Sequence, residues 1–173
     1  MNEQPQTPDL AAIKERQQRA WASGDYAMFG AALLIMSELL CEAVDLRPGQ
    51  TVLDVATGSG NTALAAARRF GETTGIDYVP ALLERGRERA AAERLEVAFR
   101  EGDAEDIPFP DASFDVVLST VGVMFHRTRR RRPVSCSGFA AQGGGSAWRT
   151  GRQMASPGSW EAFSASTYPS LQA

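Results

Sequence analysis

Cysteine and histidine are scarce in this chain, which has two cysteines and one histidine among 173 residues. Cys41 and Cys136 lie far apart, so they indicate neither a disulfide framework nor a cysteine-based zinc motif, and no metal site is predicted. This cysteine usage favours a reducing, cytoplasmic setting. No apolar run reaches the about 18 residues of a membrane span, and the N-terminus lacks the pattern of a signal peptide. The net charge of −3 gives no overall attraction to nucleic acid or to an acidic membrane.

Charge and leucine are unevenly distributed along the chain. Residues 1–125 carry 11 Lys and Arg against 20 Asp and Glu, whereas residues 126–173 carry seven Arg and one acid, Glu161. Of the 13 leucines, 12 lie within residues 1–125, and Leu171 is the exception. Such a jump indicates a boundary. We therefore predict a helical N-terminal cap over 1–46, a core over 47–125, and a basic tail over 126–173 that is rich in Gly, Ser and Arg. In that tail the pattern indicates no particular helix or strand, and we expect disorder.

Apolar periodicity predicts the elements of the cap and the core. Residues 10–22 and 26–45 have helical spacing, and Asp9 suits an N-cap before the first helix. The core then alternates between strands at 52–55, 73–77, 95–100 and 113–120 and helices at 61–70 and 80–93. This alternation predicts an α/β fold with a Rossmann-like, doubly wound parallel sheet and right-handed crossovers.

The most specific pattern lies at the end of the first predicted strand, where residues 51–60 read TVLDVATGSG. An acid, a small residue and two glycines alternate there with other residues: Asp54, Ala56, Gly58 and Gly60. Glycine permits a positive φ and lets a ligand approach the backbone closely. The pattern therefore predicts a binding turn.

Two further acids follow the next strands. Asp77 ends the second predicted strand, and Asp103 follows the third. Ligands of open parallel sheets bind at the carboxyl ends of the strands. An ionised carboxylate is a pure hydrogen-bond acceptor, so these positions suit a ligand with hydroxyl and amino groups.

In order and at this spacing, four stretches resemble the class I S-adenosylmethionine (SAM)-dependent methyltransferases. Within that class they resemble most the small-molecule branch, also called methyltransferase type 11, which includes the quinone-biosynthesis enzymes. The matching stretches are residues 52–60, 75–80, 101–115 and 119–125. The resemblance implies SAM as cofactor and a small molecule as methyl acceptor, and it implies neither an oligomeric state nor a particular acceptor atom.

The resemblance also assigns roles to residues. Asp77 would accept hydrogen bonds from the ribose hydroxyls, and Asp103 would accept one from the adenine amino group. The Ala104 N–H would donate to an adenine nitrogen, and Asp54 would hold the turn or accept from the cofactor's ammonium group. The full set of expected cofactor residues is Asp54, Ala56, Gly58, Gly60, Asp77, Tyr78, Asp103, Ala104 and Thr120. No dedicated catalytic residue is predicted, because alignment of donor and acceptor can supply much of the acceleration.

Two other functions fit some features of the pattern. Gly58, Gly60 and Asp77 also match a fingerprint for dinucleotides, which would make the chain a fragment of an NAD-dependent oxidoreductase. Asp54 and the stretch 102–115 argue against it, since neither belongs to that fingerprint. A protein that still holds SAM without catalysis is the other alternative.

Several residues near these motifs have two readings each. Trp21 and Tyr26 either lie at the mouth of the pocket or anchor the cap on the sheet, and the second reading is favoured. Met124 and Phe125 either touch a ligand or pack in the core. His126, the single histidine, is a general base by residue type but lies where the resemblance has ended.

After residue 125 the resemblance is expected to stop. A complete fold of this class continues with a helix, a Pro-Gly-Gly turn and a parallel fifth strand, in the order 3-2-1-4-5-7-6. Here five of the seven residues from 126 to 132 are Arg. Codons for 141–153 can be chosen so that an adjacent frame reads Arg-Pro-Gly-Gly-Arg-Ile-Gly-Leu-Ala-Asn-Trp-Thr-Pro. One hypothesis is therefore a frameshifted or truncated methyltransferase.

The other hypothesis is a genuine basic tail that binds nucleic acid or a partner, although no motif for nucleic-acid recognition adjoins it. Without a fifth strand, the fourth strand would be an exposed apolar edge. On that basis we expect a chain that folds poorly and turns over little.

Overall fold

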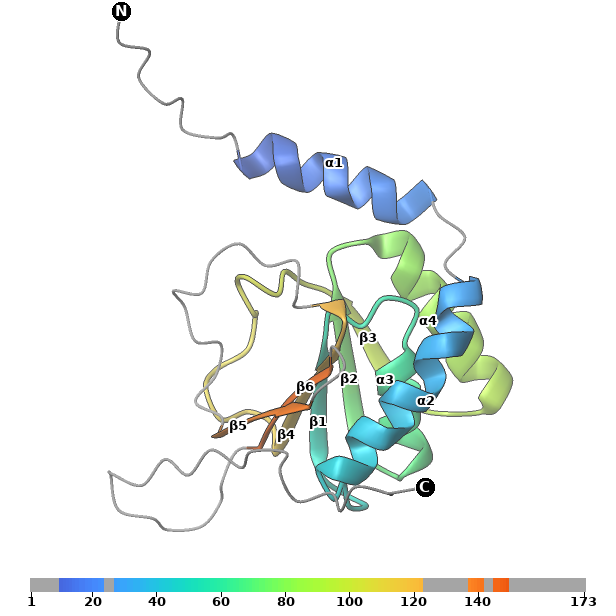
Figure 1. The fold of residues 1–173 in the computed structure, drawn as a ribbon, viewed down its shortest axis with the longest axis vertical. Helices are drawn as coiled ribbons and strands as arrows, with labels where there is room; N and C mark the ends of the chain where they lie inside the picture. The colour runs from blue at the N-terminus through green and yellow to red at the C-terminus, as the bar shows by residue number, and fades with distance from the viewer. Residues whose placement is uncertain (1–9, 24–26, 123–136, 142–144, 150–173) are drawn as a thin grey trace, which may run out of the picture.

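The computed structural model describes residues 10–23, 27–122, 137–141 and 145–149 (Figure 1). The predicted cap helices are α1 (Leu10–Ser23) and α2 (Ala27–Ala43). The predicted core consists of β1 (Thr51–Val55), α3 (Asn61–Arg68), β2 (Glu72–Asp77), α4 (Pro80–Glu93), β3 (Val97–Glu101) and β4 (Val116–Thr120). All eight predicted elements are confirmed, with ends shifted by a few residues. The N-cap predicted at Asp9 lies outside the described residues.

Local sequence explains how two core helices begin and end. Pro80 stands at the start of α4, where a residue without an N–H costs no helical hydrogen bond. Arg94 ends that helix in a left-handed conformation with φ 55°. Gly60 precedes α3 with φ 86°, a conformation that glycine adopts without strain.

The first four strands form the predicted parallel sheet. Their order is β3-β2-β1-β4, and β1 pairs in parallel with both β2 and β4. The crossovers pass through α3 and α4, which lie with α2 on one side of the sheet (Figure 1). The Rossmann-like fold predicted from the sequence is therefore confirmed, with the carboxyl ends of β1, β2 and β4 side by side.

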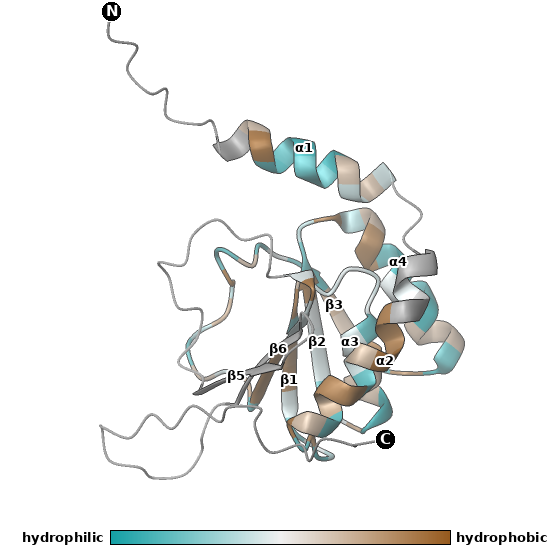
Figure 2. Ribbon diagram, viewed as in Figure 1, coloured by the Kyte–Doolittle hydropathy of each residue, from teal (hydrophilic) through white to brown (hydrophobic). Residues whose placement is uncertain are grey.

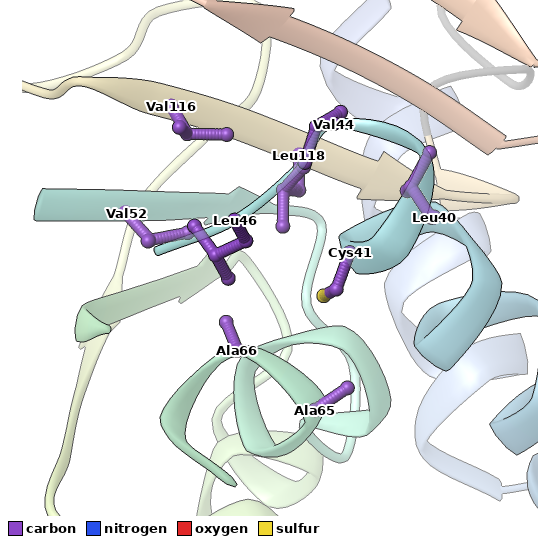
Figure 3. Packing of buried hydrophobic residues seen from close by; sticks show 9 residues of the cluster. All are labelled: Leu40, Cys41, Val44, Leu46, Val52, Ala65, Ala66, Val116 and Leu118. Atoms are coloured by element: carbon purple, nitrogen blue, oxygen red, sulfur yellow. The ribbon is translucent and has the colours of Figure 1, made fainter. Parts of the chain in front are cut away.

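The core lies on both faces of this sheet. One cluster joins α2 and α3 to alternate residues of β1 and β4, such as Val52 and Leu118 (Figure 3). On the other face, Leu53 and Val117 pack with Phe114, and the segment before β4 covers them through Ile107. Figure 2 shows polar as well as apolar residues on α1, whereas β1 is buried from Val52 to Val55. Successive residues of β1 point to opposite faces, and the two clusters bury the strand on both sides.

The tail differs from its prediction. The structure contains β5 (Ser137–Ala141) and β6 (Gly145–Arg149), which pair with each other antiparallel. β6 also pairs antiparallel with β4 over its whole length, from Val116 to Thr120. The prediction of an exposed β4 edge is therefore wrong, because β6 pairs with the backbone groups of β4, and two strands lie where the sequence indicated none. β6 is antiparallel to β4, whereas the resemblance predicts a parallel fifth strand at this edge.

None of the helices in the described ranges has the length and apolarity that crossing a membrane requires.

Candidate functional site

A cavity of about 210 Å³ lies at the carboxyl ends of β1, β2 and β4. The polar contacts of α1 place this helix at the same ends of the strands (Figure 1). Six of the nine expected cofactor residues line the cavity: Ala56, Gly58, Asp77, Tyr78, Ala104 and Thr120. The other three, Asp54, Gly60 and Asp103, are not among its lining residues. The structure thus gathers most of the predicted site and gives the remaining three residues other positions.

The two glycines of the turn have different tasks. Gly58 has φ 55°, and a Cβ added there would meet nothing within 4 Å. Glycine therefore keeps open space on the cavity side, as a cofactor lying against the backbone requires. Gly60 has φ 86°, and a Cβ added there would lie 2.8 Å from Cζ of Phe99. Glycine is therefore required at this second position for close packing against Phe99.

Asp54 lies beneath the turn and is 1% exposed. Its Oδ2 accepts hydrogen bonds from Thr57 Oγ1 at 2.6 Å and from the Ala63 N–H at 3.0 Å. Of the two roles that the sequence left open, these contacts fit the one that holds the turn. Burial raises the pKa of Asp54 to about 7, against the opposing effect of these two hydrogen bonds. Its Oδ1 has no hydrogen-bond partner in the described residues.

Asp77 ends β2 and lines the cavity while being only 5% exposed. Its Oδ2 accepts from the Gly58 N–H and its Oδ1 from the Val79 N–H, both at 2.9 Å. Burial raises the pKa of this carboxyl, and the backbone N–H donors oppose the shift. Each carboxylate oxygen can accept a further hydrogen bond, so Asp77 keeps capacity for two ligand hydroxyls.

Asp103 is half-buried beside the cavity and pairs with Lys14 of α1. The Lys14 Nζ also lies 2.8 Å from Glu105 Oε2. Burial lowers the pKa of Lys14, but the two carboxylates outweigh it and the net shift is upward. This pairing could not be predicted from the sequence, since Lys14 lies about 90 residues earlier, on a helix interpreted only as part of the cap.

Two further side chains of α1 reach the site. Gln18 Nε2 donates to the Tyr78 carbonyl at 2.6 Å, and Trp21 lines the cavity. Trp21 therefore lies at the cavity, which is the interpretation that the sequence favoured less. Tyr26, Met124, Phe125 and His126 lie outside the described residues, and so do the roles considered for them.

A chain of three hydroxyl groups forms another section of the cavity wall. Thr62 Oγ1 donates to Thr120 Oγ1 at 2.8 Å, and Ser37 Oγ lies 3.1 Å from Thr62 Oγ1. Thr62 has one hydroxyl hydrogen and gives it to Thr120, so Ser37 is the donor to Thr62. The Thr120 hydroxyl hydrogen is then directed to a different acceptor, and all three residues line the cavity. Thr120 was predicted here, whereas Ser37 and Thr62 were missed because neither belongs to a recognised motif.

The described residues contain no group of three or more His, Cys, Asp and Glu side chains placed to hold a metal ion. The cavity instead offers small residues, backbone N–H groups and one carboxylate with free acceptor capacity. This donor and acceptor set fits a nucleoside with an attached amino acid.

Comparison with known proteins agrees with this chemistry. Residues 52–138, which make up half of the chain, match the model of a family described as methyltransferase domain. The match runs beyond residue 125, where the resemblance was expected to end. An uncharacterised protein of Mycobacterium bovis is 40% identical over 139 residues, covering 80% of this chain and 51% of that protein. A demethylmenaquinone methyltransferase of Deinococcus radiodurans is 47% identical over 73 residues, covering 41% of this chain and 30% of the enzyme.

A solved structure supports the fold. A proposed S-adenosyl-L-methionine-dependent methyltransferase from Methanococcus maripaludis superposes with a TM-score of 0.54 at 19% identity, covering 75% of this chain and 57% of that one. The chain belongs to the class I SAM-dependent methyltransferases, and its cofactor is SAM. It spans about half the length of the mycobacterial relative and less of the Deinococcus one.

Proposed function

We propose that this chain transfers a methyl group from SAM to a small-molecule acceptor, and that the cavity at the carboxyl ends of β1, β2 and β4 is the reaction site. The observation that carries the proposal is the Asp77 carboxylate. It is buried, fixed by two backbone N–H groups, and lines the cavity with acceptor capacity remaining. Adjacent ribose hydroxyls are ligands that match such a carboxylate.

The other predicted residues take their roles from their positions around Asp77. Ala104 and Tyr78 line the cavity beside it, which suits the adenine ring, and Asp103 lies next to them. Ala56 and Gly58 leave room along the turn for the methionine moiety of the cofactor. The sulfonium of SAM supplies the methyl group, and the residues of this chain contribute by alignment and by exclusion of water.

The acceptor is a small lipophilic molecule of quinone-like type. Leu33, Trp21 and Val121 give the cavity an apolar wall, and the Thr120 hydroxyl provides a donor beside it. The name of the Deinococcus relative points to the same class of acceptor. The scarcity of cysteine supports a cytoplasmic location. No nucleic-acid partner is expected.

The experiment is a transfer assay with methyl-labelled SAM and a short-chain demethylmenaquinol as acceptor probe. We expect label in the quinone fraction that depends on both acceptor and protein. A parallel thermal-shift assay compares S-adenosylhomocysteine (SAH) with NADH, and we expect stabilisation by SAH alone. SAH binding without transfer to any acceptor tested would indicate a protein that holds the cofactor without catalysis. Stabilisation by NADH instead would support the oxidoreductase alternative.

A further inference from the structure

Arg89 of α4 reaches the glycine-rich turn from behind. Its Nη1 lies 2.7 Å from the Ser59 carbonyl oxygen, 3.2 Å from Ser59 Oγ and 2.7 Å from Asn61 Oδ1. The side chain is half-buried, and Ser59 and Asn61 stand 30 and 28 residues earlier in the chain. A guanidinium that donates to a carbonyl and an amide oxygen makes charge-assisted hydrogen bonds, which are stronger than neutral ones.

Asn61 passes this contact on to a third helix. Its Oδ1 accepts from Arg89, and its Nδ2 donates to the Gly30 carbonyl of α2 at 3.0 Å. Both halves of the Asn61 amide are therefore engaged, and its orientation is fixed by its two partners. Arg89, Asn61 and Gly30 thus link α4, the start of α3 and the start of α2.

The link bears on the cavity although Arg89 stands behind the cavity wall. Ser59, Asn61 and Gly30 line the cavity, whereas Arg89 is not among its lining residues. Arg89 therefore reaches a ligand only through the groups that it holds. Ser59 and Asn61 belong to the turn and to the start of α3, whereas Lys14 of α1 pairs with Asp103 instead.

We propose that Arg89 is a positioning residue that holds the glycine-rich turn and α2 in the arrangement that binds the methionine moiety of SAM. This inference rests on the proposed function, which places the nucleoside at Asp77 and the amino-acid moiety along the turn. It adds a residue of α4 to the site, and it divides the cavity into two regions that respond differently to mutation.

The division provides the test. SAH carries both the nucleoside and the amino-acid moiety, whereas 5′-deoxy-5′-methylthioadenosine carries the nucleoside and a thioether alone. Affinities for both ligands are measured by titration calorimetry on wild type, Arg89→Met, Arg89→Lys and Arg85→Met. Arg85 is an exposed residue of the same helix, so its substitution is a control for loss of one positive charge.

We expect Arg89→Met to lower the affinity for SAH about tenfold, because the variant loses charged hydrogen bonds. The same variant should change the affinity for methylthioadenosine by less than about twofold, since the nucleoside contacts are unaltered. Arg89→Lys should recover a share of the SAH affinity, and Arg85→Met should match wild type for both ligands.

The inference would be overturned if Arg89→Met lowered the affinities for the two ligands equally, or lowered neither. If Arg89→Met does not fold, Asn61→Ala removes the middle of the link and must show the same selective loss of SAH. Failure of wild type to bind SAH would instead refute the proposed function, so the two failures are distinguishable.

Discussion

The Asp77 carboxylate accepts a hydrogen bond from the Gly58 N–H at 2.9 Å, which ties the end of β2 to the turn after β1. A second bond between the same two segments runs from the Thr57 N–H to the Ile76 carbonyl, also at 2.9 Å. The acceptor proposed for the ribose is thus fixed by the turn proposed for the methionine moiety. A site held in this way before binding spends little free energy on ordering its own groups.

Asp54 should make the stability of the fold depend on pH. Its pKa is about 7 in the folded protein because of burial, against about 3.9 for Asp in an unfolded chain. The folded state therefore binds this proton more tightly, and the contribution is fully present below about pH 4 and lost as the pH rises through about 7. Asp54→Asn cannot ionise, so its free energy of unfolding in urea should fall less than that of wild type between these values. Identical pH profiles for the two proteins would contradict the assignment.

Gly60→Ala should destabilise the protein more than substitution of another glycine with positive φ. Gly49 has φ 77° with nothing within 4 Å of an added Cβ, so Gly49→Ala bears backbone strain alone, about 1 kcal/mol. Gly60→Ala adds the collision with Phe99, for a total of about 3 kcal/mol. The free energies of unfolding of both variants are compared in urea. Equal losses would show that Phe99 moves aside without cost.

Lys14→Met should speed release of the cofactor. The ion pairs from Lys14 to Asp103 and Glu105 fasten α1 beside the nucleoside end of the cavity. They are partly exposed, so we expect a modest rise of about threefold in the SAH dissociation rate, measured by stopped flow. Salt should raise the wild-type rate and leave that of Lys14→Met unchanged. Arg16→Met on the same helix is the control, and a matching effect there would mean that charge alone is responsible.

The gene itself should reveal the origin of the tail. We predict that a frame adjacent to codons 126–173 encodes Pro-Gly-Gly followed by an apolar strand, because the coded tail can be rewritten in that way. Nucleotide sequencing across this region gives the answer directly. A gene in which neither alternative frame holds that sequence would make the basic tail, with its β5 and β6 hairpin, the genuine continuation.

Sequence alone predicted the parallel sheet and six residues of the cavity wall, because both depend on local signals. Gly58 follows β1 and Asp77 ends β2, and parallel strands bring their carboxyl ends together. The contacts of Lys14, Ser37 and Arg89 could not be predicted in this way. Each depends on where one helix lies against another, and the spacing along a single helix does not specify that position.

The strands of the tail could not be predicted from the sequence either. Its composition, rich in Gly, Ser and Arg, gave no periodic signal for a strand, yet the β4 edge from Val116 to Thr120 pairs with β6. Antiparallel pairing requires backbone groups rather than a particular apolar pattern, so composition alone did not exclude it.

The central claim is that the cavity beside Asp77 holds the nucleoside of SAM. The most direct measurement is titration of SAH into wild type and into Asp77→Ala at the same temperature and buffer. Circular dichroism confirms first that both proteins are folded. We predict one binding site per wild-type chain and no detectable heat for Asp77→Ala. Equal affinity in the two proteins would place the cofactor elsewhere and contradict the account.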